Sequence, residues 1–291
     1  MKIALTAIAR HENRYLKEWF DYYKGIGIDH IFIGDNNDVD DSENIQDFVD
    51  ELGYGDFVTV INKRKDKSTQ QNTDVQNNFY KETYDTYGKD FDWMCFFDID
   101  EYLQINPQFY KETTINHYVE SCCERCKTKY NVNPEQIQVG WLMYDDNDKL
   151  FYEDKPLQER FTRLSENIYR DTLYRNVMCG KVIVKCGLDD VIFPDMHHSE
   201  FTNHTQYTCL NGGYKCDSYV DMANSFIRID AVLKHYYSKS LEEFIQKRFG
   251  DKTSYIDIGD FENCVKQYFS VNKRTLEKEK LFELYKKLLE K

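Results

Sequence analysis

The first hundred residues alternate short apolar runs with longer amphipathic ones, and this alternation limits the fold more than any other feature of the chain. Four runs have the length and composition of strands: 2–9, 30–34, 57–61 and 93–97. The runs between them are expected to form helices: 13–26, 42–52 and 69–87, with Ser42 as the cap of the second. Strands separated by helices pair in parallel through right-handed crossovers. The sequence therefore predicts an α/β protein with a mostly parallel, doubly wound sheet.

The rest of the chain is expected to continue this architecture less regularly. Ser240 and Glu243 have the spacing of a capping box, which predicts a helix from Leu241. Neither an internal repeat nor a flexible linker is visible, so we expect one domain that ends in helices. The other expected elements are strands at 136–144, 182–185 and 228–233, a loop-rich region at 195–225 and an amphipathic helix at 274–289.

Composition excludes several classes of protein. The formal net charge of −13 argues against binding to nucleic acid, which needs a basic face. The apolar run at the N-terminus is short and Arg10 follows it, so we interpret it as a strand and not as a signal peptide. The chain has no run of 18 apolar residues, so we expect no membrane-spanning helix. Nine cysteines without an export signal indicate a reduced, cytoplasmic protein.

Polar clusters follow three of the expected strands, at 10–13, 35–37 and 98–101. Ligands of such sheets bind outside the carboxyl ends of the strands, where these clusters would meet. On an extended chain Asp98 and Asp100 would point to the same side and could bind a hard divalent cation, Mg²⁺ or Mn²⁺. The chain has neither G-x-G-x-x-G after the first strand nor a P-loop, which argues against a dinucleotide oxidoreductase and a P-loop NTPase.

Several motifs together resemble the nucleotide-sugar glycosyltransferases of the GT-A fold, and more narrowly the family 92-like group that is related to family 2. The resemblance spans residues 3–251, and His11 stands where the pattern usually has Asn. The matching pieces are 6–19 (TAIARHENRYLKEW), 30–37 (HIFIGDNN), 96–103 (FFDIDEYL), Trp141, 159–161 (ERF), Lys181, 234–244 (KHYYSKSLEEF) and 247–251 (KRFGD). This likeness implies a nucleotide-sugar-binding and catalytic domain over 1–240 and a helical extension over 241–291 packed on it.

For the donor, the resemblance implies that Asp98 and Asp100 hold Mn²⁺ or Mg²⁺ and, through it, the diphosphate of a UDP-sugar. Glu12 and Asp35 would contact the nucleoside. The simpler interpretations are a first-turn helix charge for Glu12 and a turn residue for Asp35. Lys181 would approach the donor phosphates, or else be a snorkelling surface lysine.

Lys239, just before the predicted helix start, could complete an anion site with the helix N-terminus. His197 and His235 are the candidates for a third metal ligand. A core histidine is the alternative for His235. Asp145 is the candidate general base for the acceptor hydroxyl, in competition with Glu159 and Glu200. Trp141 could stack on the acceptor sugar or belong to the core.

The expected activity is metal-dependent transfer of a hexose to a glycan or lipid-linked saccharide, with inversion, in surface polysaccharide or lipopolysaccharide synthesis. We expect the protein in the cytoplasm, where the helix at 274–289 could attach it to the inner face of the membrane. Two alternatives use other chemistry. A nucleotidyltransferase or phosphohydrolase could use the same carboxylates, and a non-catalytic protein could bind glycans through its many aromatic residues.

Overall fold

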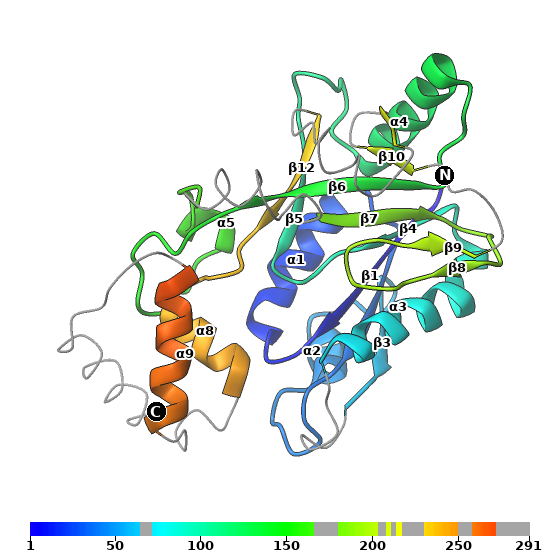
Figure 1. Ribbon diagram of the computed structural model, residues 1–291. Helices are drawn as coiled ribbons and strands as arrows, with labels where there is room; N and C mark the ends of the chain where they lie inside the picture. Colours follow the sequence, from blue (N-terminus) through cyan, green and yellow to red (C-terminus); the bar gives the residue numbers. More distant parts are fainter. Residues whose placement is uncertain are drawn as a thin grey trace.

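The computed structural model describes residues 1–64, 72–165, 180–202, 208–210, 214–216, 230–249 and 258–271. These residues form the predicted α/β fold, with a central sheet flanked by helices (Figure 1). The expected helix at 274–289 lies outside the described residues. None of the described helices is both long enough and apolar enough to cross a membrane.

The central sheet is mixed, with a parallel N-terminal half. Its strand order is β11-β10-β6-β7-β4-β1-β2-β3. Strands β3, β2, β1 and β4 run parallel, whereas β7 is antiparallel to both of its neighbours, β4 and β6. The strands of this path are β1 (Ile3–Ala9), β2 (His30–Asp35), β3 (Val58–Asn62), β4 (Trp93–Phe96), β6 (Gln136–Met143), β7 (Gly180–Lys185), β10 (Thr208–Leu210) and β11 (Tyr214–Cys216).

Helices cover both faces of this sheet, as the alternation predicts. On one face α1 (Asn13–Gly25), α2 (Ile45–Glu51) and α4 (Ile115–Tyr130) contribute to one large core; α3 (Asn72–Tyr87) packs on the other face. Helix α1 buries Leu16, Trp19 and Tyr23 at helical spacing, which explains its position against the sheet. Gly27 follows it with φ +93°, a conformation that favours glycine.

Two local predictions need correction. Helix α2 begins at Ile45 and not after Ser42, because the Asn44 side chain caps it by accepting hydrogen bonds from the amides of Gln46 and Asp47. The segment from Asp98 to Glu101 is a tight turn and not an extended chain, since the Glu101 amide bonds back to the Asp98 carbonyl at 3.1 Å. Alternation of side chains along a strand therefore does not determine where Asp98 and Asp100 point.

A late strand brings the C-terminal part of the chain to this turn. β12 (Ala231–His235) lies between β5 (Glu101–Ile105) and β6, antiparallel to the first and parallel to the second. Beyond it, the Tyr236 amide donates to the Asp100 carbonyl at 2.9 Å. β12 therefore fixes the start of the following helix beside the 98–101 turn.

The C-terminal helices form a smaller core of their own. Helices α8 (Leu241–Phe249) and α9 (Ile258–Val271) pack on each other and on Leu150, Phe151 and Tyr237, at one end of the molecule (Figure 1). The capping box is confirmed, because the Ser240 amide donates to the Glu243 carboxylate and the Glu243 amide to Ser240 Oγ. The remaining described elements are α5 (Leu157–Arg160), a 3₁₀ helix (Gly88–Asp90), β8 (Val191–Ile192) and β9 (Glu200–Phe201).

Candidate active site

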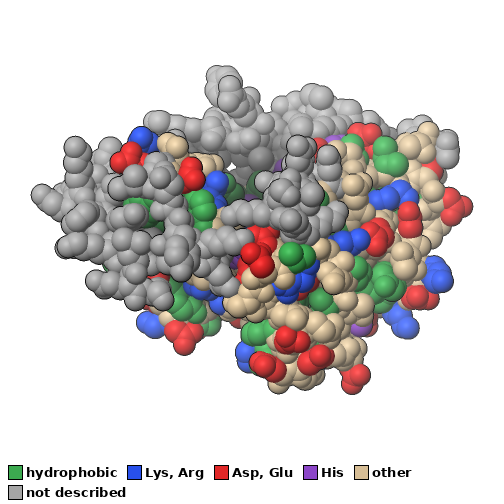
Figure 2. All heavy atoms as spheres, turned by 90° about the horizontal axis from the view of Figure 1, so that it is seen from below, with side chains coloured by type: hydrophobic (Ala, Val, Ile, Leu, Met, Phe, Trp, Pro, Cys, Tyr) green, Lys and Arg blue, Asp and Glu red, His purple; other side chains and the backbone are tan. Residues whose placement is uncertain are grey.

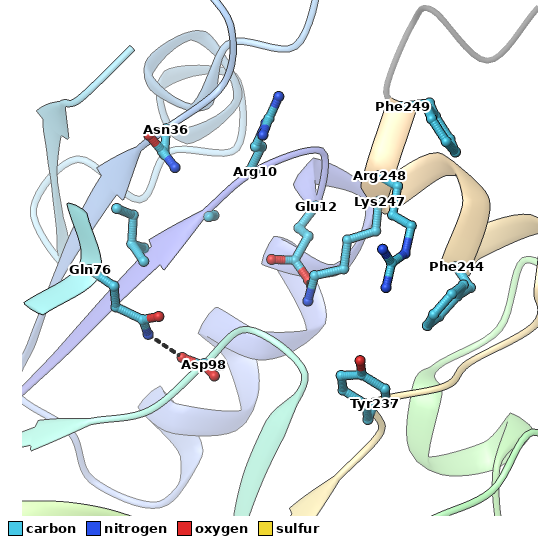
Figure 3. Close-up of a pocket in the computed structure, with 12 residues that line it drawn as sticks. Arg10, Glu12, Asn36, Gln76, Asp98, Tyr237, Phe244, Lys247, Arg248 and Phe249 are labelled. Carbon is cyan, nitrogen blue, oxygen red and sulfur yellow. Dashed lines mark hydrogen bonds and ion pairs between the residues drawn. The ribbon is translucent and has the colours of Figure 1, made fainter. Parts of the chain in front are cut away.

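A pocket of about 500 Å³ opens at the carboxyl ends of β1, β2 and β4 (Figure 3). This is the position at which ligands bind to open α/β sheets. The first two strands supply its wall through residues that follow them, α3 contributes Gln76, and the turn after β4 contributes Asp98. Helix α8 closes the opposite side, so the pocket includes residues on both sides of the predicted domain boundary at 240. The lining residues are Ile8, Ala9, Arg10, Glu12, Asn36, Gln76, Asp98, Tyr237, Phe244, Lys247, Arg248 and Phe249.

The 98–101 turn is held rigidly from within. The Glu101 carboxylate accepts a hydrogen bond from the Asp98 amide at 2.9 Å, and the Trp19 indole donates to both the Asp98 and the Glu101 carbonyls at 3.2 Å. The Glu101 side chain is fully buried, and this burial raises its pKa well above the ordinary range. Glu101 therefore shapes the turn and does not face the pocket.

Asp98 is at the base of the pocket with one oxygen engaged and one facing outward. Its Oδ1 lies 2.9 Å from Lys181 Nζ and accepts a hydrogen bond from Gln76 at 2.8 Å. The Lys181 ammonium is fully buried, and its contact is an ion pair without good hydrogen-bond alignment. Burial favours a raised pKa for Asp98, but the Lys181 ammonium outweighs it and holds the pKa below the ordinary value. Among the described residues, nothing donates to Asp98 Oδ2.

Asp100 is paired with two lysines behind the pocket wall. Lys239 Nζ lies 2.7 Å and Lys247 Nζ 3.0 Å from its Oδ2, and His235 Nε2 lies 3.4 Å from its Oδ1. Burial alone favours a raised pKa for Asp100, but the Lys239 and Lys247 ammonium groups lower it well below the ordinary range. Lys247 also contacts Glu12 Oε1 at 2.9 Å. Both carboxylates are thus neutralised by lysines of the C-terminal part.

The predicted metal ligands do not form a cation site in this arrangement. In the part of the chain that the structure describes, no three His, Cys, Asp or Glu side chains converge as metal ligands. The carboxylate and imidazole chemistry suits Mn²⁺, but ammonium groups occupy the coordinating oxygen of Asp100. Two unit charges 4 Å apart interact by about 4 kcal/mol at an effective dielectric of 20, so a dication beside two lysines is strongly disfavoured.

The two candidate histidines both pack on Trp141. The His197 ring centroid lies 5.1 Å and the His235 centroid 4.4 Å from that of the indole. His197 Nδ1 is within hydrogen-bond distance of the Gly180 carbonyl at 3.1 Å. Burial lowers the pKa of His197, which favours its neutral form. His235, which is nearly buried, faces Asp100, so only this histidine approaches one of the two predicted metal-binding carboxylates.

Asp35 is not among the residues that line the pocket, and both of its carboxylate oxygens accept hydrogen bonds from backbone amides. Its Oδ1 accepts from the Asn37 amide at 3.0 Å, and its Oδ2 accepts from the Ile45 amide at 3.3 Å at the start of α2. Arg64 lies 3.5 Å from the same oxygen. The neighbouring Asn36 lines the pocket instead. The simpler interpretation of Asp35, as a turn residue, describes its contacts.

Asp145 is likewise not among the residues that line the pocket. Its carboxylate accepts from Arg163 Nε at 2.6 Å and from the Asn147 amide at 2.8 Å. Among the competing candidates, Glu159 is on the short helix α5, and Glu200 contacts His198 at 3.1 Å. The structure therefore does not bring the predicted general base together with Asp98 and Glu12.

Sequence reasoning missed Lys247 and Gln76 as pocket residues. Lys247 follows Glu243 by four positions, so the capping box placed it on a predictable helix face. The sequence did not show which part of the fold would pack against that face of the helix. Gln76 has no local signal beyond its place in a polar helix, because its partner Asp98 is 22 residues away.

Comparisons with known proteins give a fold-level likeness only. No protein-family model matches the chain, and no curated protein does. Among solved structures, a crystal structure of S. aureus TarS is similar at 10% identity with a TM-score of 0.41, over 99% of this chain and 43% of that one. A structure of S. aureus TarS 1–349 is similar at 8% identity with a TM-score of 0.38, over 99% of this chain and 71% of that one. The chain thus spans less than half the length of the first of these structures.

Proposed function

We propose that the protein is a glycosyltransferase that moves a hexose from a UDP-sugar to a glycan or lipid-linked saccharide in surface polysaccharide or lipopolysaccharide synthesis. The observation that carries this proposal is the pocket at the carboxyl ends of β1, β2 and β4, with Asp98 on one side and Lys247 on the other. Its volume of about 500 Å³ is in the range of sites for small ligands.

The lining residues divide into groups that suit the parts of a sugar nucleotide. Lys247 and Arg248 present cations from α8, which suit a diphosphate. Asp98 Oδ2 and Gln76 present polar atoms that suit sugar hydroxyls. Asn36 follows β2, where a nucleoside would extend along the edge of the sheet.

The transfer itself forms one bond and breaks one. The acceptor hydroxyl oxygen attacks the anomeric carbon, the bond from that carbon to the diphosphate breaks, and the hydroxyl proton passes to a base. Attack opposite the leaving group inverts the anomeric centre. Cations beside the diphosphate would stabilise the charge that develops on it. The base remains to be assigned by mutagenesis of Asp145, Glu159 and Glu200.

A ligand and product assay tests this function. UDP, GDP and CDP are screened by thermal shift, and binding at a hundredfold excess over Kd adds roughly 2.7 kcal/mol of stability. The tightest nucleotide is then supplied as its radiolabelled hexose conjugate with saccharide acceptors. Sugar transfer that is lost in Asp98→Asn supports the proposal. Release of pyrophosphate or phosphate instead would indicate the nucleotidyltransferase or phosphohydrolase alternative, and glycan binding without any nucleotide response would indicate a non-catalytic protein.

A further inference from the structure

The pairing of Asp100 with lysines bears on how a diphosphate would be bound. Asp100 and Lys239 are both almost completely buried, with 2% of each side chain exposed. Oδ2 of this carboxylate accepts from Lys239 and Lys247, and Oδ1 faces His235. A divalent cation at Asp100 Oδ2 would have to displace both ammonium groups from that oxygen.

Lys247 differs from Lys239 because it reaches the pocket. Its side chain is 42% exposed and lines the cavity, while its ammonium stays within 3.0 Å of both Asp100 and Glu12. Lys239 and Lys247 together offset the charges of Asp100 and Glu12. The buried layer behind the pocket is therefore neutral without any metal.

Arg248 adds a cation to this neutral layer. It lines the pocket next to Lys247, and its guanidinium lies 4.6 Å from the centroid of the Phe244 ring. No described carboxylate forms an ion pair with it. Figure 3 shows Lys247 and Arg248 directed from α8 toward the space beside Tyr237 and Asp98. An anion in that space would meet the Arg248 guanidinium and, beside it, the Lys247 ammonium, which already pairs with Asp100 and Glu12.

We infer that this pocket binds the diphosphate of a nucleoside diphosphate directly through Lys247 and Arg248. The ammonium groups of Lys239 and Lys247 occupy the position on Asp100 that a divalent cation would take. The inference rests on the proposed function and deepens it, because it makes nucleotide binding independent of metal. It departs from the divalent-cation site that the Asp98–Asp100 motif predicts.

Isothermal titration calorimetry tests this with the full chain. UDP, GDP and CDP are titrated into the protein in EDTA and in Mn²⁺. The dissociation constant of the tightest-binding nucleotide is then measured for the variants. We expect dissociation constants that agree within about threefold between the two buffers. Lys247→Met and Arg248→Met should each weaken binding at least tenfold, and Lys247→Arg should restore most of it. Lys266→Met is the matched control, since Lys266 is an exposed lysine of α9 that lies 3.9 Å from Glu262 one turn away.

The outcomes separate this inference from the proposed function. Nucleotide binding that EDTA weakens more than tenfold would overturn metal-independent binding and leave the glycosyltransferase proposal standing. Metal-free binding that neither Lys247→Met nor Arg248→Met alters would overturn the role of these cations. Absence of nucleotide binding in both buffers would overturn the proposed function itself. Circular dichroism of each variant confirms that it is folded, and Arg248→Met leaves the Asp100 pairing intact.

Discussion

Lys239 Nζ lies 2.7 Å from Asp100 Oδ2, and the two groups are 139 residues apart in the chain. Both side chains are buried, so each charge depends on the other for its stability. This pair joins the turn after β4 to the start of α8. It makes the geometry of the pocket dependent on the correct docking of the C-terminal elements.

Asp100→Asn should be strongly destabilising. The substitution removes the nearer anion of the buried Lys239 ammonium and leaves it the Glu12 carboxylate at 3.8 Å. Breaking a buried pair costs about 3–5 kcal/mol. Urea denaturation measures the change in the free energy of unfolding. The control is Asp85→Asn, which removes the exposed partner of Lys81 on α3 and should cost less than about 1 kcal/mol. Equal losses of unfolding free energy in the two variants would show that the buried Asp100–Lys239 pair contributes no more to stability than the exposed control pair.

Arg160 and Glu243 should be energetically dependent on each other. The guanidinium donates two hydrogen bonds of 2.8 Å to the Glu243 carboxylate, and both side chains are buried. Arg160→Met and Glu243→Gln should each cost about 3–5 kcal/mol. The double variant should cost clearly less than the sum, because the second substitution removes a charge that the first left unpaired. A double-mutant cycle in urea measures this, and additive costs would contradict it.

Glu101 should make the protein less stable as the pH rises. Its pKa is raised by burial in the folded state, so its stabilising contribution is complete below the unfolded pKa of about 4.3 and is lost as the pH rises toward the folded pKa. Each pKa unit corresponds to about 1.4 kcal/mol. Glu101→Gln should therefore gain stability relative to the wild type between pH 4.5 and pH 7. Parallel stability curves of the two proteins over this range would contradict a raised pKa of the buried Glu101 carboxyl.

Asn44→Ala should destabilise the protein by about 1 kcal/mol, since it removes the side chain that accepts from the Gln46 and Asp47 amides. Asn44→Asp keeps the accepting oxygen and should retain most of the stability. Thermal unfolding followed by circular dichroism compares the three proteins. A cap that lies at Ser42, as the sequence suggested, would leave Asn44→Ala without effect.

Features set by neighbouring residues could be predicted from the sequence. The α1 helix and the capping box of Ser240 and Glu243 depend on local spacing and backbone preference, and both are confirmed. The parallel pairing of β1 with β2 and β4, and of β2 with β3, agrees with the alternation of strands and helices. The start of α2 was misplaced because Ser42 and Asn44 are both good caps, and in the structure it is the Asn44 side chain that accepts from the first helical amides.

The site could be predicted less completely because its contacts join distant segments. The sequence predicted Glu12, Asp98, Lys181 and Lys239 as site residues, but not that the lysines would pair with the carboxylates. Those partners depend on β12 lying between β5 and β6, a pairing that no local pattern specifies. In the sequence Asp35 and Asp145 resemble Asp98, because each is an acid that follows an expected strand. In the structure they differ from Asp98 in the residues that donate hydrogen bonds to their carboxylates.

The insertion of β12 between β5 and β6 also has a consequence for synthesis of the chain on the ribosome. Asp100 is translated 139 residues before Lys239. At about 5–20 residues per second, the Asp100 carboxylate is made roughly 7–28 s before its Lys239 counter-charge. The buried Asp100–Lys239 pair can therefore form only after most of the chain has been synthesised.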